Sequence, residues 1–390
     1  MVKLATREQC TGCTACSASC PHGAVSMTAD DEGFLQPVVD EKCCVRCGKC
    51  ERVCPALHRG DAREPSRCFI AKAKNNAVRE QSSSGGVFTV LAEGIVRDGG
   101  KVYGAAWQKP EFVCRHIGVG DEHGLAALRG SKYVQSDLRG VFPNVKKDLD
   151  DGHPVLFSGC PCQIAGLKSF LGCDYDNLLC VSLICNSVPS PRIFKAWCEA
   201  ERKRVGLASE LLDVKFRDKQ AGWHNSTFKF HFTTTNTTSL QRSAYYWLWQ
   251  EGYVVRRSCI DCVLREFRDG ADLTIGDAWG IERFAPAFDD NRGVSVILAM
   301  SEKGTDYLRS VESEMNVESV AMEQILPGNP TLIKSFDLLK KAGPRRDEFW
   351  RKMNAGGDVI ALAKRFTRRP LRLRIRIAVG KVLRKVGLKK

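Results

Sequence analysis

Between residues 67 and 330, the spacing of apolar positions changes repeatedly and predicts alternating helices and strands. Apolar residues three or four apart are typical of amphipathic helices, and a Gly-Gly pair ends the first of these at residue 100. Short continuous apolar runs are typical of buried strands. Helices are predicted at 85–100, 163–171 and 190–204, and strands at 101–107, 154–159, 178–185, 226–234, 271–277 and 294–300. This alternation favours a mixed sheet covered by helices.

The two ends of the chain differ from this middle part. The first 60 residues are rich in cysteine and repeat at a 34-residue offset, and a polar stretch at 59–66 reads as a linker. A helical, basic segment is predicted after residue 330. We therefore expect an α+β protein with a small module at 1–60, two parts of one larger domain at 67–150 and 151–330, and a helical basic tail at 331–390.

Composition describes an ordinary globular protein. The 390 residues are 43% hydrophobic and 27% charged, which is enough for two or three domains. No apolar run approaches the roughly 18 residues of a membrane span, and the N-terminus has no apolar signal-peptide core. Many of the 19 cysteines fall in runs that need free thiolates, so we expect a reducing, cytoplasmic location.

The net charge of +14 comes mainly from the end of the chain. Residues 364–390 hold twelve Lys and Arg and no Asp or Glu, so the rest is nearly neutral. After Pro370, apolar residues recur at helical spacing among the basic ones, which favours peripheral attachment to an anionic membrane surface. A solvated tail, an edge strand or a helix docked on an acidic partner are the alternatives. The tail lacks interleaved aromatic residues, so nucleic-acid binding is not expected.

The cysteines of the module follow the spacing Cys-x2-Cys-x2-Cys-x3-Cys-Pro twice. This doubled run is the arrangement of bacterial two-cluster ferredoxins, in which the fourth cysteine of each run ligates the cluster of the other run. Two zinc knuckles or unrelated buried thiols are the alternative. The spacing predicts two 4Fe-4S clusters, one held by Cys10, Cys13, Cys16 and Cys54 and one by Cys44, Cys47, Cys50 and Cys20, with Cys43 as a spare.

Further cysteines lie in three short stretches of the large domain, where turns meet strands or helices. A Cys-x2-Cys pair joined by cysteines from separate loops makes a plausible set of four thiolates. Zinc would suit such a set, but two clusters are already predicted, so a third 4Fe-4S cluster is favoured. Free cysteines in a core are the alternative. The preferred ligands are Cys162, Cys185, Cys259 and Cys262, with Cys160 left over.

Several polar loops of the large domain suit a bound phosphate or flavin. The loop before the first helix could direct backbone N–H groups at a phosphate, and the others add cations, aromatic rings and a carboxylate. Each loop alone is more often an ordinary turn, and no GxGxxG or P-loop motif is present. The candidate cofactor-binding residues are Ser84, Gly85, Gly86, Lys132, Tyr133, Arg217, Lys219 and Asp277, with Trp223 and Trp279 nearby.

Taken together, these stretches resemble the coenzyme F420 hydrogenase/dehydrogenase beta-subunit family, in the form with an N-terminal two-cluster ferredoxin module. The resemblance rests on SSGGVFT, YGAAW, GSKYVQSDL, GCPCQIAGLKSFL, CNSVPSPRIF, FRDKQAGW and SCIDCVLREFRDGADLTIGDAWGI, and covers about residues 1–300. Cys160 replaces the family's usual threonine and Asn186 its usual histidine, which changes the electrostatics around the predicted third cluster.

The resemblance implies a flavin-dependent iron–sulfur oxidoreductase that holds FAD or FMN beside a cluster. Electrons would pass between the clusters and the flavin, and between the flavin and a deazaflavin coenzyme or another organic substrate, such as one of surface-polysaccharide biosynthesis. Ferredoxin or another redox protein would be the partner. The alternative is a non-catalytic relay protein that connects a partner enzyme to an electron carrier. The sequence identifies no catalytic residue.

Overall fold

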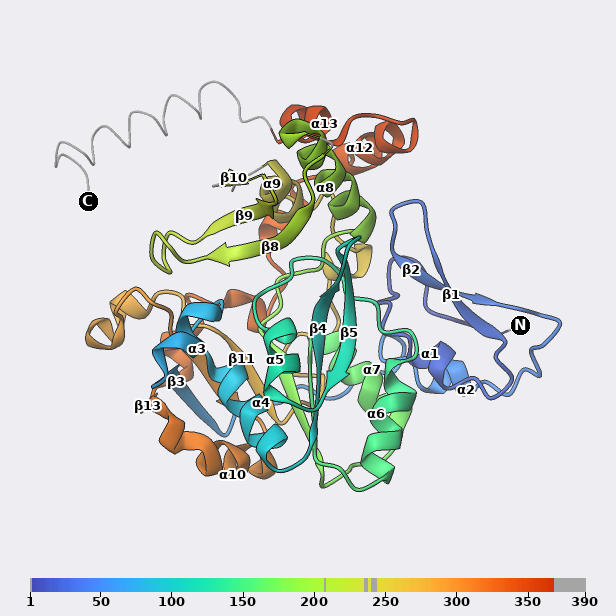
Figure 1. Ribbon diagram of the computed structural model, residues 1–390. Helices are drawn as coiled ribbons and strands as arrows, with labels where there is room; N and C mark the ends of the chain where they lie inside the picture. The colour runs from blue at the N-terminus through green and yellow to red at the C-terminus, as the bar shows by residue number, and fades with distance from the viewer. Residues whose placement is uncertain (1, 207, 235–237, 240–243, 368–390) are drawn as a thin grey trace.

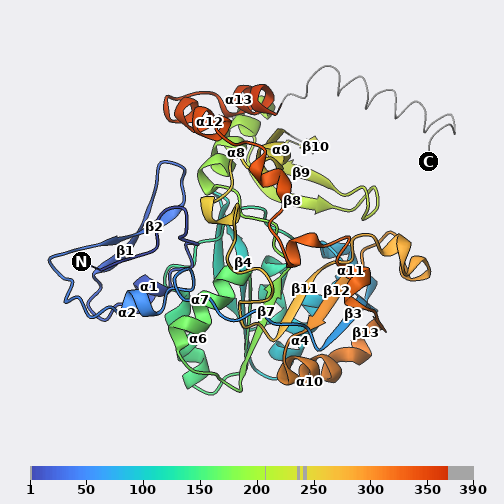
Figure 2. The ribbon, with the colours of Figure 1, turned by 180° about the vertical axis from the view of Figure 1, so that it is seen from behind.

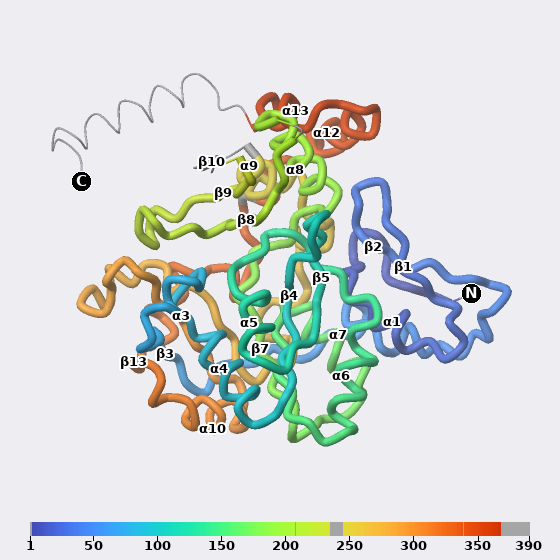
Figure 3. Tube along the Cα trace, viewed as in Figure 1, coloured from blue at the N-terminus to red at the C-terminus, as the bar shows by residue number. Residues whose placement is uncertain are grey.

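The computed structural model describes residues 2–206, 208–234, 238–239 and 244–367 of the chain. Figure 1 shows three parts: a small N-terminal module, a central sheet with helices on both faces, and an upper layer built on a smaller sheet. Figure 2 shows the same layers from behind. The tube in Figure 3 places the N-terminal module, in blue, at one side of the central sheet.

The N-terminal module consists of two short helices and an antiparallel hairpin. Each helix begins within a cysteine run: α1 spans Ala15–Ala18 and α2 spans Lys49–Arg52. The hairpin pairs β1 (Val25–Ala29) with β2 (Leu35–Val39). The hairpin extends upward beside the upper layer in Figure 1, so the module contacts two parts of the molecule.

The central sheet has eight strands in the order β13-β3-β12-β11-β7-β6-β4-β5. Strands β4, β6, β7 and β11 are parallel, so their carboxyl ends lie at one edge of the sheet, facing the upper layer. The strands span Arg67–Ala73 (β3), Lys101–Gln108 (β4), Val113–Val119 (β5), Val155–Gly159 (β6), Leu178–Leu183 (β7), Leu273–Asp277 (β11), Ser295–Ala299 (β12) and Met315–Ser319 (β13).

Helices cover both faces of this sheet, so its strands are buried on both sides. Leu156 of β6 packs with one group of helices, while its neighbours Val155 and Phe157 point the other way. One face carries α4 (Val87–Arg97), α5 (Glu122–Leu128) and α10 (Glu302–Val311), and the other carries α6 (Val141–Asp150) and α7 (Pro161–Leu171). Two short helices lie near β3 and β13: α3 (Asn76–Gln81) in Figure 1 and α11 (Met322–Ile325) in Figure 2.

The upper layer combines a three-stranded sheet with four helices around a core rich in aromatic residues. The sheet order is β10-β9-β8, and Phe216, Phe228 and Phe230 fill the space beneath it. The elements are β8 (Leu211–Asp218), β9 (Thr227–Phe232), β10 (Thr238–Ser239), α8 (Pro191–Val205), α9 (Ala244–Gln250), α12 (Arg345–Asn354) and α13 (Val359–Phe366).

The structure corrects the interpretation of residues 331–367 as part of a tail. Helices are present there, as predicted, but Phe349, Trp350 and Phe366 are buried in the core of the upper layer. The signal was already in the sequence, because large apolar residues recur through this segment. The remaining basic residues, 368–390, lie outside the described residues. Within the described residues, no helix is both long and apolar enough to cross a membrane.

The nine helices and strands predicted between residues 85 and 300 are all present, with ends shifted by a few residues. The first helix begins at Val87 rather than at residue 85, because Gly85 packs against the backbone of Ala71 and Ser295 and Gly86 has a φ of 87°. The mixed α/β architecture is therefore confirmed. Strands β3, β5, β8 and β13 were not predicted, because they do not stand out as separate apolar runs.

Candidate iron–sulfur centres and an adjoining cationic site

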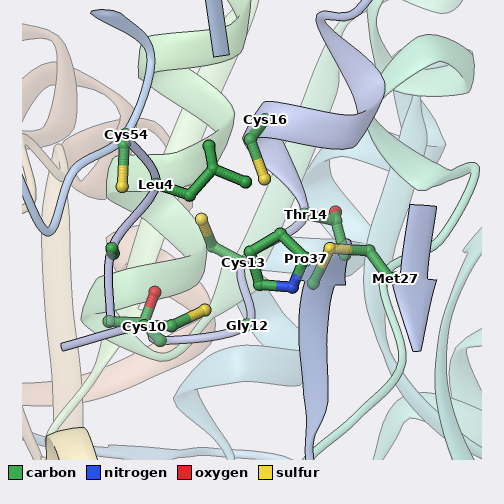
Figure 4. Close-up of a pocket in the computed structure, with 11 residues that line it drawn as sticks. Leu4, Cys10, Gly12, Cys13, Thr14, Cys16, Met27, Pro37 and Cys54 are labelled. Atoms are coloured by element: carbon green, nitrogen blue, oxygen red, sulfur yellow. The ribbon is translucent and has the colours of Figure 1, made fainter. Parts of the chain in front are cut away.

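Four cysteines from the two runs line one cavity in the N-terminal module (Figure 4). Three come from the first run and Cys54 comes from the end of the second. The cavity encloses about 340 Å³ free of protein atoms, part of it open to solvent, and Leu4, Met27 and Pro37 form apolar walls. The structure thus brings together Cys10, Cys13, Cys16 and Cys54, the set that the crossed arrangement predicts.

The loops of both runs have the backbone shape that suits an anionic group. Gly12 and Thr14 in the first run, and Arg46 and Gly48 in the second, have φ angles between 56° and 70°. Left-handed residues that alternate with ordinary ones turn successive N–H groups into a concavity, a device found at many iron–sulfur sites. The residues present therefore fit a cluster in each loop.

Burial raises the pKa of three thiols of the first set, Cys13, Cys16 and Cys54. Burial has the largest effect on Cys13, and with a smaller contribution from the Cys10 and Cys54 thiols the pKa of Cys13 is raised to about 11. Four neighbouring thiols deprotonate together only when a cationic centre binds among them. This donor set suits iron, which cysteine thiolates bind in ferredoxins.

The second set lies nearer the surface of the module. Burial and the nearby Cys20 thiol raise the pKa of Cys50, so the crossed partner is close to this run as well. Cys20 and Cys44 are half-buried and Cys47 is exposed. Cys43 is exposed and bonds to Asp40, outside the set.

Five cysteines gather at the carboxyl edge of the central sheet. Cys160 and Cys162 follow β6, Cys185 follows β7, and Cys259 and Cys262 come from the loop after α9. The thiols of Cys185, Cys259 and Cys262 all raise the pKa of Cys162, after the larger effect of burial. Cys160 donates to Cys185, which raises the pKa of Cys160 and lowers that of Cys185. The structure therefore brings together the four preferred ligands and the leftover Cys160.

These five thiols are not arranged around a single metal ion. Among the described residues, no group of three or more His, Cys, Asp and Glu side chains is placed to hold one. Cys160, Cys162 and Cys185 lie at the same edge because β6 and β7 are neighbouring parallel strands.

The N-terminal module packs closely on α7, and this contact lies between the first and third sets of cysteines. A Cβ at Gly166 of α7 would come within 2.7 Å of Cys13 Cβ, so only glycine lets the module approach this helix. Cys13 is also among the thiols that raise the pKa of Cys162. The module is thus docked with its inner cavity toward the third set.

A buried cation lies beside the third set, where β8 of the upper layer meets the end of β11. Arg217 Nη1 donates to Asp277 Oδ2 at 2.9 Å and lies 3.5 Å from the Tyr133 hydroxyl. Trp223 Nε1 donates to the other oxygen of Asp277, and its ring stacks on Trp279 at 4.9 Å between centroids. The Arg217 side chain is 9% exposed, yet its Nη2 has no hydrogen-bond partner among the described residues.

This cationic site and the third set occupy adjacent strand ends. Ile184, next to Cys185, donates its backbone N–H to Ile275 of β11, two residues before Asp277. Tyr133 packs on Trp249 at 4.4 Å, and Trp249 Nε1 donates to Ser187 Oγ. An aromatic surface therefore connects the surroundings of Cys185 with those of Arg217.

The remaining candidates for a cofactor site already have partners within the protein. Lys219 Nζ donates to the carbonyl oxygens of Arg79, Ser84 and Arg292, which ties the Ser84 loop to β8. Ser84 Oγ donates to the Val294 carbonyl, and the Gly85 N–H donates to Ser295 Oγ. Burial lowers the pKa of Lys219 to about 8.

Lys132 lies apart from this site, at the end of α5. Its Nζ lies 2.8–3.3 Å from the carbonyl oxygens of Ala127, Leu128, Arg129 and Gly130, where a cation satisfies the last carbonyls of a helix. Burial lowers its pKa to about 8. These bonds give Lys132 a structural function that the sequence did not indicate.

Two family models match the chain. Residues 152–325 match the model that describes the C terminus of the coenzyme F420 hydrogenase/dehydrogenase beta subunit, and residues 9–57 match the model of the 4Fe-4S dicluster domain. We call these two matched regions the beta-subunit domain and the dicluster domain, respectively. The resemblance predicted from the sequence is confirmed, and the chain is an iron–sulfur protein related to these oxidoreductases.

The solved structures that are similar to this chain include a chain of the F420-reducing NiFe hydrogenase complex from Methanosarcina barkeri, at 16% sequence identity and a TM-score of 0.49. The match covers 76% of this chain and 94% of that chain. No curated protein matches the chain.

Sequence reasoning missed the residues that join the dicluster domain to the beta-subunit domain. Arg256 donates to the Cys10 carbonyl at 2.6 Å, and Gln135 donates to the Thr11 carbonyl at 2.9 Å. Glu32 of the dicluster domain is 1% exposed and pairs with Arg257 and Arg346. Such partners are far apart in sequence, and only the proximity of Arg256 to Cys259 could have drawn attention to one of them.

Proposed function

We propose that this chain is a flavin-dependent iron–sulfur oxidoreductase. The supporting observation is that the candidate sites adjoin one another: Cys54 of the second run lines the first-run cavity, Cys13 of that cavity lies near Cys162 at the sheet edge, and Arg217 lies at the adjacent strand end. When bound, the clusters would supply one-electron storage and the flavin would supply hydride exchange. The protein would hold these groups in sequence and keep water from the inner ones.

The flavin would bind beside Arg217, because this residue has an unused donor. A buried guanidinium with a free N–H suits an anionic or carbonyl group of a ligand, and Asp277 and Trp279 fix its position. Tyr133, which is half-buried, provides an aromatic ring nearby. Ser84, Gly85, Gly86 and Lys219 would then shape the site through their bonds to the sheet instead of contacting phosphate themselves.

The metal ligands in this proposal are the predicted ones. Cys10, Cys13, Cys16 and Cys54 would hold one cluster, Cys44, Cys47, Cys50 and Cys20 a second, and Cys162, Cys185, Cys259 and Cys262 a third. The partner would be a ferredoxin or another redox protein. A deazaflavin coenzyme or an organic substrate, such as one of surface-polysaccharide biosynthesis, would react at the flavin; this part rests on the family resemblance alone.

The test is flavin retention after anaerobic reconstitution with iron, sulfide and either FAD or FMN. Arg217→Ala should weaken retention by about 1–3 kcal/mol, since a charge-assisted hydrogen bond is lost. Arg292→Ala, which removes an exposed guanidinium near Lys219, is the matched control and should retain flavin like the unaltered protein.

Two outcomes would contradict the proposal. Full iron and sulfide without any flavin in the unaltered protein would favour the relay protein instead. Equal flavin content in the Arg217→Ala and Arg292→Ala proteins would remove Arg217 from the site. Lys132→Ala should lower stability without changing flavin affinity, because the Lys132 ammonium is bonded to helix carbonyls.

A further inference from the structure

Besides Arg217, four arginines are buried among the described residues, and they fall into two pairs. Arg79 and Arg346 have carboxylate partners, Asp290 at 2.6 Å and Glu32 at 2.5 Å. Arg256 and Arg265 have none within the part of the chain that the structure describes. A buried cation without a counter-charge is costly, so an anion is expected beside each of the second pair.

The Arg256 guanidinium contacts the first-run cysteine loop at several atoms. Its Nε donates to the Cys10 carbonyl, and its Nη2 lies 3.3 Å from Cys10 Sγ and 2.8 Å from the Leu35 carbonyl. Its Nη1 donates to Gln135. A Cβ at Gly12 would come within 2.6 Å of Nη1, so the loop and the guanidinium are in direct contact. Cys10 is therefore the group beside Arg256 that becomes negatively charged when its thiol binds a metal.

Arg265 has the same relation to the third set. Its guanidinium donates to the carbonyl oxygens of Cys185, Asn186 and Thr331. The guanidinium is therefore in direct contact with the loop that carries Cys185, a ligand of the third set. Asp269 also lies near Cys262, and its two carboxylate oxygens accept from the Ser182 hydroxyl and the Ala271 N–H.

We propose that Arg256 and Arg265 are the counter-charges of the two inner clusters and raise their reduction potentials above that of the outer, second-run cluster. This inference rests on the ligand sets of the proposed function. Reduction adds negative charge to a cluster, and a fixed, desolvated cation beside it stabilises the reduced form more than the oxidised form. The basic residues near the second run are exposed and screened by solvent. The potentials therefore favour electron movement from the surface toward the interior.

The experiment is a redox titration of the reconstituted full-length protein, followed by EPR, which requires neither flavin nor substrate. Arg256→Gln should lower the midpoint potential of the first-run cluster and leave the second-run cluster unchanged. Arg256→Lys keeps the charge, so its midpoint potential should lie closer to that of the unaltered protein. Arg265→Gln should shift the third cluster alone. Arg257→Gln is the matched control, because Arg257 lies at the same interface but pairs with Glu32 and Asp347.

Iron content distinguishes electrostatic from structural effects. Arg256→Gln could lose about four irons while Arg256→Lys keeps both its irons and the unaltered midpoint potential. That result would show that the cluster requires a positive charge at this position, and it would support the proposal. Loss of iron from both variants would make Arg256 a packing residue and overturn the proposal. Unchanged potentials in Arg256→Gln with full iron, or equal shifts in Arg256→Gln and Arg257→Gln, would overturn it as well. A failure to bind flavin would leave all these readings intact, so it contradicts only the proposed function.

Discussion

At the scale of single residues, Cys160 and Cys162 compete for one position in the third cysteine set. Five thiols are present where a cube needs four. Cys162 lies in the first turn of α7, and the pKa of each of these two thiols responds to three others of the set. The backbone N–H of Cys160 is bonded to Gln163 at the start of the same helix, and its thiol donates to Cys185. This arrangement favours Cys162 as the ligand and Cys160 as its hydrogen-bonding neighbour.

We therefore expect Cys162→Ser to remove roughly four irons per chain, whereas Cys160→Ser should retain them. The measurement is iron and sulfide content after anaerobic reconstitution, with EPR to show that the two module clusters remain. Cys160→Thr restores the residue usual in the family and should behave like Cys160→Ser. Loss of iron from Cys160→Ser but not from Cys162→Ser would reverse the assignment.

At the scale of elements, the β1–β2 hairpin is fixed to the upper layer by a buried charge cluster. Glu32 in the hairpin turn pairs with Arg257 at 2.8 Å and with Arg346 of α12 at 2.5 Å. Ser190, the N-cap of α8, donates its hydroxyl to the Glu32 carbonyl. Gly33 has a φ of 82°, and a Cβ there would meet Arg192 at 2.4 Å. The dicluster domain is therefore held by specific contacts beyond the linker.

Glu32→Gln should destabilise this docking strongly, by about 3–5 kcal/mol, because Arg346 would be left buried without its charge partner. The measurement is thermal unfolding combined with hydrogen exchange of the hairpin, residues 25–39. Asp31→Asn is the control, since the Asp31 side chain is 55% exposed. If both variants lose stability equally, the buried pair does not fix the hairpin.

At the scale of the whole molecule, the second cysteine run carries several exposed basic side chains. Lys42, Arg46 and Lys49 are exposed around Cys47, and Val45 adds an apolar patch that is 59% exposed. An acidic electron carrier would be attracted to such a face, and its association would weaken as salt rises. In the proposed function, this face is where electrons enter or leave.

Arg46→Glu and Lys49→Glu should each slow reduction by an acidic ferredoxin at low ionic strength, while reduction by dithionite stays unchanged. Lys203→Glu reverses an exposed charge on α8 of the upper layer and serves as the control. Stopped-flow absorbance of the clusters provides the rates. Equal rates for all three variants would exclude this face as the docking surface.

The basic tail supports a second prediction about the whole molecule, although it lies outside the described residues. Full-length protein should co-sediment with anionic vesicles at low salt and be released as salt rises, since each basic residue near lipid contributes about 1 kcal/mol. The shortened chain for comparison must end at Thr367, because Phe366 is in the core and its carbonyl accepts from Tyr253. Equal sedimentation of the full and shortened chains would remove the tail from any membrane role.

Features that depend on local spacing could be predicted from the sequence. The two cysteine runs identified the dicluster domain, because ligand spacing in a tight loop is a local property. The helices and strands between residues 85 and 300 followed from apolar period, and Ser190 and Pro191 marked the start of α8 correctly. The motifs of the beta-subunit domain were equally local and supported the resemblance.

Which of these features meet depends on the tertiary structure. Parallel pairing of β6 and β7 placed Cys160, Cys162 and Cys185 at one edge, and Asp277 followed on the next strand. The tertiary structure also assigned Lys132 to a helix end and residues 345–366 to the core, since burial depends on what packs against a segment. The contacts of Arg256 with the Cys10 loop join residues 246 positions apart, and no local pattern encodes such a pairing.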